Sequence, residues 1–155
     1  MNTPSDSYPP FISAIAVQGA SEAIDFYQRA FGATERYRLT DSASGKIGHA
    51  ELDVNGSMFM LSDENPDWNK SPKTLGGTTV KFCLMVENAD VSFDRAVAAG
   101  ATVIMPVSDQ FYGYRCGSVL DPYGYEWMLQ HVVEKVPHEE MQRRWDNMVK
   151  DCKPA

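Results

Sequence analysis

His49 and Glu51 are the residues of this sequence whose types and spacing best fit proton-transfer chemistry. Two positions apart on an extended strand, their side chains point to the same face of a sheet. Imidazole titrates near neutral pH and a neighbouring carboxylate raises its pKa, so the pair could exchange a proton with a bound substrate. The alternative is an ion pair that only satisfies a polar cavity. We keep both interpretations and treat the two residues as candidate catalytic groups.

A strong turn signal bounds the strand that carries this pair. Asn55-Gly56 is typical of two-residue β-hairpin turns, and it predicts a hairpin in which Glu51 lies opposite Met60. Directly opposed residues point to the same face of a sheet. The sequence therefore predicts that His49, Glu51 and Met60 line one wall of a cavity.

A second hairpin is expected to complete this wall. With its turn at Tyr123-Gly124, Val119 would lie opposite Met128. Because side chains alternate between faces, the pairing decides which residues of both strands reach the cavity. The residues added to this face are Arg115, Gly117 and Gln130 from the hairpin, joined by Ile12, Lys81 and Cys83 from the first strands.

This mixture of side chains suits a small ligand with an apolar body and a few polar groups. Methionines adapt to ligands of varied shape, and aromatic rings near the last hairpin could stack on a planar ligand. Core packing is the alternative for each methionine and each ring. The candidate ligand-binding residues are Lys81, Arg115, Gln130, Met60, Met128, Gln110, Tyr112 and Trp127.

An internal repeat indicates which elements position these residues. Short matches recur in the same order 68 or 69 positions later, and the pattern DxxGxxxML begins at Asp53 and again at Asp121. Each copy starts with an apolar run, continues with helical periodicity and ends with three alternating or apolar segments. The predicted fold class is α+β: two βαβββ modules that form curved mixed sheets, followed by a C-terminal helix.

The composition along the chain sets the boundaries of these modules. Residues 1–10 are expected to be a flexible N-terminus, 11–63 the first module, 64–78 a linker or lid, 79–132 the second module, and 133–155 a helical tail. Within the first module, Ser21 is a plausible N-cap of the helix and Gly32 its C-terminal stop.

The tail carries an apolar stripe that needs a surface to cover. From about Pro137, the residues Met141, Trp145, Met148 and Val149 recur at helical spacing. Either the protein's own sheet or a partner could supply that surface. Since two such modules also leave sheet edges open, we expect a homodimer with Trp145 and Met148 at or near the contact.

Several segments together resemble the vicinal oxygen chelate superfamily, which includes glyoxalase I, extradiol dioxygenases and the bleomycin and fosfomycin resistance proteins. FYQRAFGA, GKIGHAEL, SPKTLGG, DQFYGYR, DPYG and HEEMQRR are similar to its PhnB-like branch, often labelled demethylubiquinone methyltransferase-like. The resemblance covers about Phe11 to His131 and implies the paired-module fold. Members share the scaffold and differ in chemistry, so it does not imply one activity.

In the metal-dependent relatives, the resemblance places four ligands on the first and last strands of the two modules. The corresponding positions here are Ile12, Lys81, Met60 and Met128. Neither Ile nor a protonated Lys offers a lone pair, and thioethers prefer soft metals. We therefore expect the usual metal positions to be non-ligating. No GxGxxG or Walker A pattern is present, and no cofactor is predicted.

Charge and composition exclude several other classes. The formal charge of −7 disfavours nucleic acid as a partner, and no apolar stretch of membrane-spanning length or secretion signal is encoded, so a cytoplasmic protein is expected. The cysteines Cys83, Cys116 and Cys152 are far apart and are expected to be buried, reduced thiols.

Three functions fit these observations. The first is binding of a small organic molecule in a cavity without the usual metal. The alternative is a lyase, isomerase or dioxygenase-type enzyme, which would use His49 and Glu51 directly or a relocated metal held by residues among His49, Glu51, Gln130 and His131. The third is a scaffold whose modules serve mainly for dimerisation.

Overall fold

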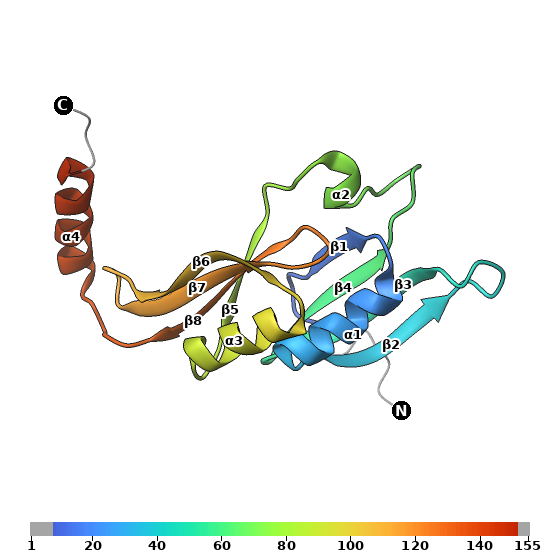
Figure 1. Ribbon diagram of the computed structural model, residues 1–155, viewed down its shortest axis with the longest axis horizontal. Helices are drawn as coiled ribbons and strands as arrows, with labels where there is room; N and C mark the ends of the chain where they lie inside the picture. Colours follow the sequence, from blue (N-terminus) through green and yellow to red (C-terminus); the bar gives the residue numbers. More distant parts are fainter. Residues whose placement is uncertain (1–7, 152–155) are drawn as a thin grey trace.

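The computed structural model describes residues 8–151 and contains two βαβββ modules (Figure 1). The first comprises β1 (Ser13–Val17), α1 (Ala20–Phe31), β2 (Thr34–Thr40), β3 (Ile47–Val54) and β4 (Ser57–Asp63). The second comprises β5 (Lys81–Met85), α3 (Ala89–Ala99), β6 (Thr102–Asp109), β7 (Tyr114–Leu120) and β8 (Glu126–Val132). The short helix α2 (Pro72–Leu75) lies between them, and α4 (His138–Asp151) follows. The predicted fold class is confirmed.

Both modules form the same kind of mixed sheet. The strand orders are β1-β4-β3-β2 and β5-β8-β7-β6, with the first strand parallel to the last and the other pairs antiparallel. The two modules share one core because α1 and α3 lie side by side beneath the sheets (Figure 1). Trp127 of β8 is 3% exposed and packs against Phe31 of α1 and Phe59 of β4. The other face of each sheet is left uncovered by these helices.

Asp121 ties the modules together across this core. Its carboxylate accepts hydrogen bonds from the Tyr27 hydroxyl of the first module at 2.7 Å and from the Trp127 indole N–H at 2.9 Å. It also accepts from the backbone N–H groups of Tyr123 and Tyr125. The sequence indicated only a turn at this position. Because Asp121 is 3% exposed, its loss would leave buried donors without partners.

The predicted register is confirmed for the first hairpin and wrong for the second. Glu51 lies opposite Met60, as Asn55-Gly56 indicated. Val119 lies opposite Trp127 instead of Met128. The second connection is longer than a two-residue turn, because Asp121 N–H bonds the Tyr125 carbonyl at 2.9 Å and closes a loop of residues 121–125.

The predicted start of the first helix is also wrong. The N-cap of α1 is Gly19, with φ 81°, and not Ser21. The Asp63 carboxylate accepts hydrogen bonds from the N–H groups of Gly19 and Ala20, so a side chain from β4 caps this helix. Gly32, with φ 69°, ends the helix as expected.

The connection between the modules is held to the first of them. Glu64 accepts hydrogen bonds from the Ser71 N–H, the Thr74 hydroxyl and the Gln18 amide. These bonds hold the pKa of Glu64 at about 2, well below its ordinary value. Asn69 in the same segment donates to the Ser62 hydroxyl at 3.0 Å.

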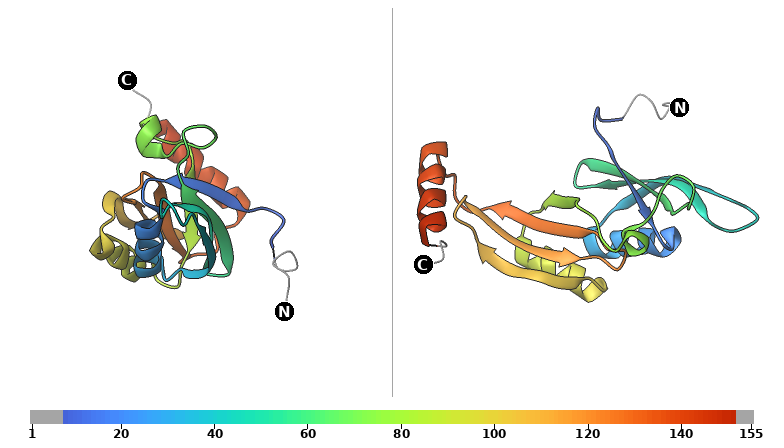
Figure 2. Two further views of the ribbon diagram at one scale, coloured as in Figure 1. Left: turned by 90° about the vertical axis from the view of Figure 1, so that its right-hand side faces the viewer. Right: turned by 90° about the horizontal axis from the view of Figure 1, so that it is seen from above.

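Helix α4 projects beyond the end of the second module (Figures 1 and 2), where its Trp145 ring lies 5.7 Å from the Phe111 ring, centroid to centroid. None of its described residues is buried. Arg144 fixes its direction by pairing with Glu134 at 2.8 Å and donating to the Phe111 carbonyl at 3.0 Å. No helix within residues 8–151 is long and apolar enough to span a membrane.

The cysteine prediction is partly wrong. Cys116 is buried, but Cys83 is exposed on the uncovered face of the second sheet. Cys152 lies outside the described residues, as does most of the N-terminal stretch 1–10.

Candidate functional site

Four side chains gather on the uncovered face of the first sheet, and we call them the Glu51 cluster: Tyr8, Tyr37, His49 and Glu51. Tyr37 of β2 lies directly opposite Glu51 of β3. His49 precedes Glu51 by two positions on the same strand, so alternation places both on one face. Tyr8 reaches the group from the segment before β1. Sheet pairing thus places the two predicted catalytic residues together.

The Glu51 carboxylate is the centre of this cluster. Its Oε1 atom accepts hydrogen bonds from the Tyr8 hydroxyl at 2.6 Å and the Tyr37 hydroxyl at 2.8 Å. The Nε2 atom of His49 lies 3.1 Å from the same oxygen. The residue is 1% exposed, although it lies on the face that the helices leave uncovered. The surrounding side chains therefore replace water around a carboxylate.

These contacts set the protonation state of Glu51. Burial by itself raises the pKa of the carboxyl, but the hydrogen bonds from Tyr8, His49 and Tyr37 outweigh it and hold the pKa below its ordinary value. The same hydrogen bond to Glu51 raises the pKa of the Tyr8 phenol. The cluster therefore contains an ionised acceptor to which two phenol hydroxyls donate.

A small cavity of about 180 Å³ adjoins the cluster. His49 and Met60 line it together with Ala14 of β1 and Asn69 of the connection. Met60 of β4 is paired with Glu51 on the neighbouring strand β3 and with Ala14 on the other neighbour, β1. The site therefore combines an apolar surface with one ionised acceptor.

The uncovered face of the second sheet holds a separate set of predicted residues. Strand pairing places Lys81 beside Glu126 and Cys83 beside Met128, so these side chains share a face. Gln130 follows on the same face, and its amide contacts Met85. The Lys81 ammonium forms an ion pair with Glu126 at 2.8 Å, so it is neutralised within its own sheet.

In the observed register of β7 and β8, other predicted residues lie on the opposite face of the sheet. Arg115 lies on the helix side of β7, where it pairs with Asp90 of α3 at 2.7 Å and Asp109 at 3.0 Å. Val119 is fully buried in the core on the same side. The predictions that Arg115, Gly117 and Val119 line the cavity are therefore wrong. A one-residue slip of the register exchanges the two faces of a strand.

Three further candidates have local partners. Trp127 is 3% exposed in the core, and it also lines a cavity of about 220 Å³ together with Phe82 and Cys83. Gln110 donates to the Ser108 hydroxyl at 2.9 Å. The Tyr112 hydroxyl lies 3.5 Å from the Cys116 sulfur, and burial raises the pKa of this phenol to about 12.

With this geometry in place, comparison with known proteins decides the family. The sequence model of the Glyoxalase/Bleomycin resistance protein/Dioxygenase superfamily matches residues 12–129. The chain belongs to this superfamily. The protein Mb0911c of Mycobacterium bovis is 41% identical over 138 residues, which cover 86% of this chain and 90% of that protein.

Solved structures include matches to this fold. An Arabidopsis thaliana gene product is 27% identical with a TM-score of 0.66, covering 80% of this chain and 99% of its own. A PhnB protein of Bacillus cereus is 21% identical with a TM-score of 0.61, and the match covers 78% of this chain and 98% of that protein's chain. At that lower identity the second match shows the fold alone.

We still predict that the positions at which the resemblance places superfamily metal ligands are non-ligating. They are Ile12, Met60, Lys81 and Met128, of which Lys81 is already paired with Glu126. A hydrocarbon, an ammonium and two thioethers form no donor set for such an ion. No three His, Cys, Asp or Glu side chains within residues 8–151 are arranged to hold one either.

The alternative ligand set is not assembled. His131 lies on the helix side of β8, opposite Arg115, and its Nδ1 accepts a hydrogen bond from the Ala89 N–H at 2.9 Å. Gln130 points to the other face of the same strand. These two residues cannot join His49 and Glu51 of the first sheet without rearrangement.

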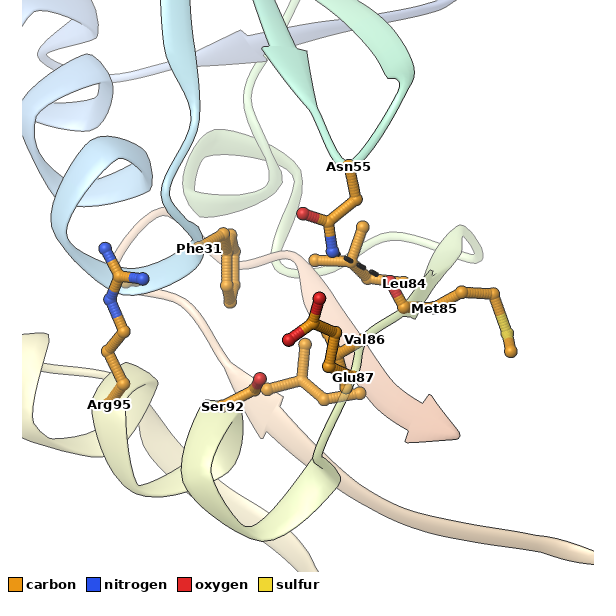
Figure 3. A pocket seen from close by; sticks show the side chains of 10 residues that line it. Phe31, Asn55, Leu84, Met85, Val86, Glu87, Ser92 and Arg95 are labelled. Atoms are coloured by element: carbon orange, nitrogen blue, oxygen red, sulfur yellow. Dashed lines mark hydrogen bonds between the residues drawn. The ribbon is translucent and has the colours of Figure 1, made fainter. Parts of the chain in front are cut away.

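A larger cavity lies elsewhere, at the junction of the modules (Figure 3). Its volume is about 520 Å³, and Phe31, Leu84 and Leu129 form its apolar floor. Glu87 and Arg95 project at its rim, and Arg95 donates to the last carbonyl groups of α1. None of the predicted site residues lines this cavity. Size alone therefore does not mark it as the functional site.

Sequence reasoning missed several partners. Tyr8 and Tyr37 complete the Glu51 cluster, and Glu126 neutralises Lys81. Alternation along β2 could have placed Tyr37 on a face, but an irregularity between Glu35 and Tyr37 breaks that pattern. For Tyr8 the sequence carried no signal.

Proposed function

We propose that the protein binds a small organic molecule on the uncovered face of the first sheet, with Glu51 as the principal hydrogen-bond acceptor. The observation that carries this proposal is a carboxylate that is 1% exposed and held by three side chains on a sheet face without a covering helix. Such a preorganised acceptor orients a ligand, and the adjoining cavity accepts an apolar group.

A fragment screen by NMR tests this function, with the Met60 methyl group as the reporter. Glu51→Gln keeps the shape and removes the charge, so ligands that shift the Met60 resonance should bind about tenfold more weakly. The matched control is Asp53→Asn, two positions along β3, whose carboxylate pairs with Arg36 at 2.8 Å. The proposal fails if no fragment shifts Met60, or if both variants bind like the wild type.

One observation favours catalysis as a second candidate. The His49 imidazole is 3.1 Å from Glu51 and about a third of its side chain is exposed, so it can reach both the carboxylate and a ligand. A lyase or isomerase could use this pair to move a proton. Exchange of a ligand C–H for deuterium in D2O, lost in His49→Gln without loss of binding, would distinguish catalysis from binding.

The site also fits a homodimer. Both sheets leave one face uncovered, and a partner module would close the cavity beside the Glu51 cluster. We propose that a second copy of the chain supplies this cover, in keeping with the projecting helix α4.

A further inference from the structure

Tyr8 differs from the rest of the Glu51 cluster in how the chain holds it. Tyr37 and His49 belong to β2 and β3, so sheet pairing fixes their rings. Tyr8 lies before β1 in a stretch without regular secondary structure, in which Phe11 is 85% exposed. Its hydroxyl nevertheless makes the shortest of the contacts to Glu51, at 2.6 Å. A phenol thus reaches the carboxylate from outside the sheet.

We propose that Tyr8 is an internal stand-in for the ligand, and that the ligand is an aryl hydroxyl compound of the para-substituted phenol class. This inference rests on the function proposed above and names its ligand class. The ligand hydroxyl takes the place of the Tyr8 hydroxyl at Glu51 Oε1, and Tyr8 moves out toward solvent.

The chemistry of Glu51 favours a phenol over other ligands. An ionised carboxylate needs a donor and repels a carboxylate ligand, and a hydrogen bond to it is stronger than one between neutral groups. Phenols, with an ordinary pKa of about 10, stay protonated at neutral pH and can donate. Because Glu51 is buried, a ligand that displaced Tyr8 without donating would leave the carboxylate with one hydrogen bond fewer.

The surroundings supply room for the rest of such a ligand. The cavity of about 180 Å³ is lined by Met60 and by His49, and the His49 ring also contacts the Glu51 oxygen that Tyr8 occupies. Met60 and Ala14 offer an apolar surface for the ring substituent. The exchange of one phenol for another conserves the hydrogen bonds of Glu51.

Tyr8 therefore competes with the ligand, which gives a directional test. The apparent affinity is reduced by the fraction of molecules in which Tyr8 occupies the site. Tyr8→Phe removes the competing hydroxyl and keeps the ring, so p-cresol should bind about fivefold to tenfold more tightly in calorimetric titration. Toluene and benzoate, which cannot donate a hydrogen bond to Glu51, should bind to neither form.

The controls separate this effect from a general change. Tyr114→Phe removes another half-buried phenol, in the second module, and should leave the p-cresol affinity unchanged. Adding Glu51→Gln to Tyr8→Phe should abolish the gain. In protein labelled with 3-fluorotyrosine, the Tyr8 resonance should move to the position of an exposed tyrosine as p-cresol saturates the site.

The remaining outcomes overturn the inference. If p-cresol binding depends on Glu51 but Tyr8→Phe leaves it unchanged or weakens it, Tyr8 does not occupy the ligand position. If p-cresol does not bind while other fragments shift Met60, the phenol class is wrong and the proposed function stands. If no compound of any class shifts Met60, the proposed function itself fails.

Discussion

At the residue scale, the Glu51 cluster shows which contacts a sequence can reveal. His49 and Glu51 are near in sequence, so strand periodicity predicted that they share a face. Their phenolic partners depend on longer-range geometry. Tyr37 reaches Glu51 only because β2 pairs with β3 across an irregularity, and Tyr8 arrives from a segment without periodicity.

The lowered pKa of Glu51 makes a stability prediction with a definite sign. The stabilisation of the fold by the ionised Glu51 carboxylate is fully present above the ordinary pKa of 4.5. It is lost as the pH falls through the lower pKa of the folded state. We therefore expect Glu51→Gln to lower the free energy of unfolding by about 1–3 kcal/mol near pH 6 and by much less near pH 3. Urea denaturation at both pH values measures this difference.

Asp53→Asn is the control for this effect. Its carboxylate is 42% exposed, so its ion pair with Arg36 should contribute less than about 1 kcal/mol. If Glu51→Gln lowered the free energy of unfolding equally at both pH values, the loss would arise from packing alone. That result would contradict a stabilising role of the ionised carboxylate.

At the element scale, the two hairpins show why one register was predictable and the other was not. Asn55-Gly56 specifies a two-residue turn, and Asn55 adopts the positive φ of 46° that this turn requires. The second connection contains a similar turn signal, but the Asp121 carboxylate accepts the Tyr123 and Tyr125 N–H groups and lengthens the loop. The amino-acid composition of a turn does not show whether one of its side chains will hydrogen-bond to the turn's backbone and lengthen it.

Gly117 tests the corrected register directly. A Cβ atom at this position would lie 2.8 Å from Phe93 of α3 and 2.8 Å from Val107 of β6. Gly117→Ala should therefore lower the free energy of unfolding by about 1–3 kcal/mol through overpacking. Equilibrium denaturation in urea provides the measurement.

Gly48→Ala is the matched control on a strand of the first module. Its added Cβ would meet only the Leu39 carbonyl, at 4.0 Å, so stability should change by less than about 0.5 kcal/mol. Equal stabilities of the two variants would mean that β7 does not approach α3 at Gly117.

At the scale of the whole molecule, the internal repeat predicted the two modules but not how they meet. Their junction depends on a shared aromatic core and on Asp121, whose partners Tyr27 and Trp127 belong to different modules. Repeat periodicity contains no information about such contacts. The helical stripe of the tail was predictable in the same way, while its projection from the body depends on Arg144 and Glu134.

The last prediction concerns assembly and follows from the projection of α4. Trp145 is 47% exposed and Met148 39% exposed on a helix that Arg144 holds in a fixed direction. A rigid helix with exposed apolar side chains loses little entropy on docking, and a buried Trp commonly contributes much of the binding energy of an interface. We expect a homodimer at micromolar concentration, and Trp145→Ala should raise its dissociation constant by about thirtyfold or more, which corresponds to about 2 kcal/mol.

Analytical ultracentrifugation over a range of concentrations measures both expectations, and Trp68→Ala is the size-matched control. Trp68 is 77% exposed on the connection between the modules, away from α4, so its loss should leave the dissociation constant unchanged. A wild-type protein that sediments as a monomer at micromolar concentration would contradict the homodimer. Equal dissociation constants for Trp145→Ala and Trp68→Ala would instead remove α4 from the interface, and the uncovered sheet faces would then have to form the contact alone.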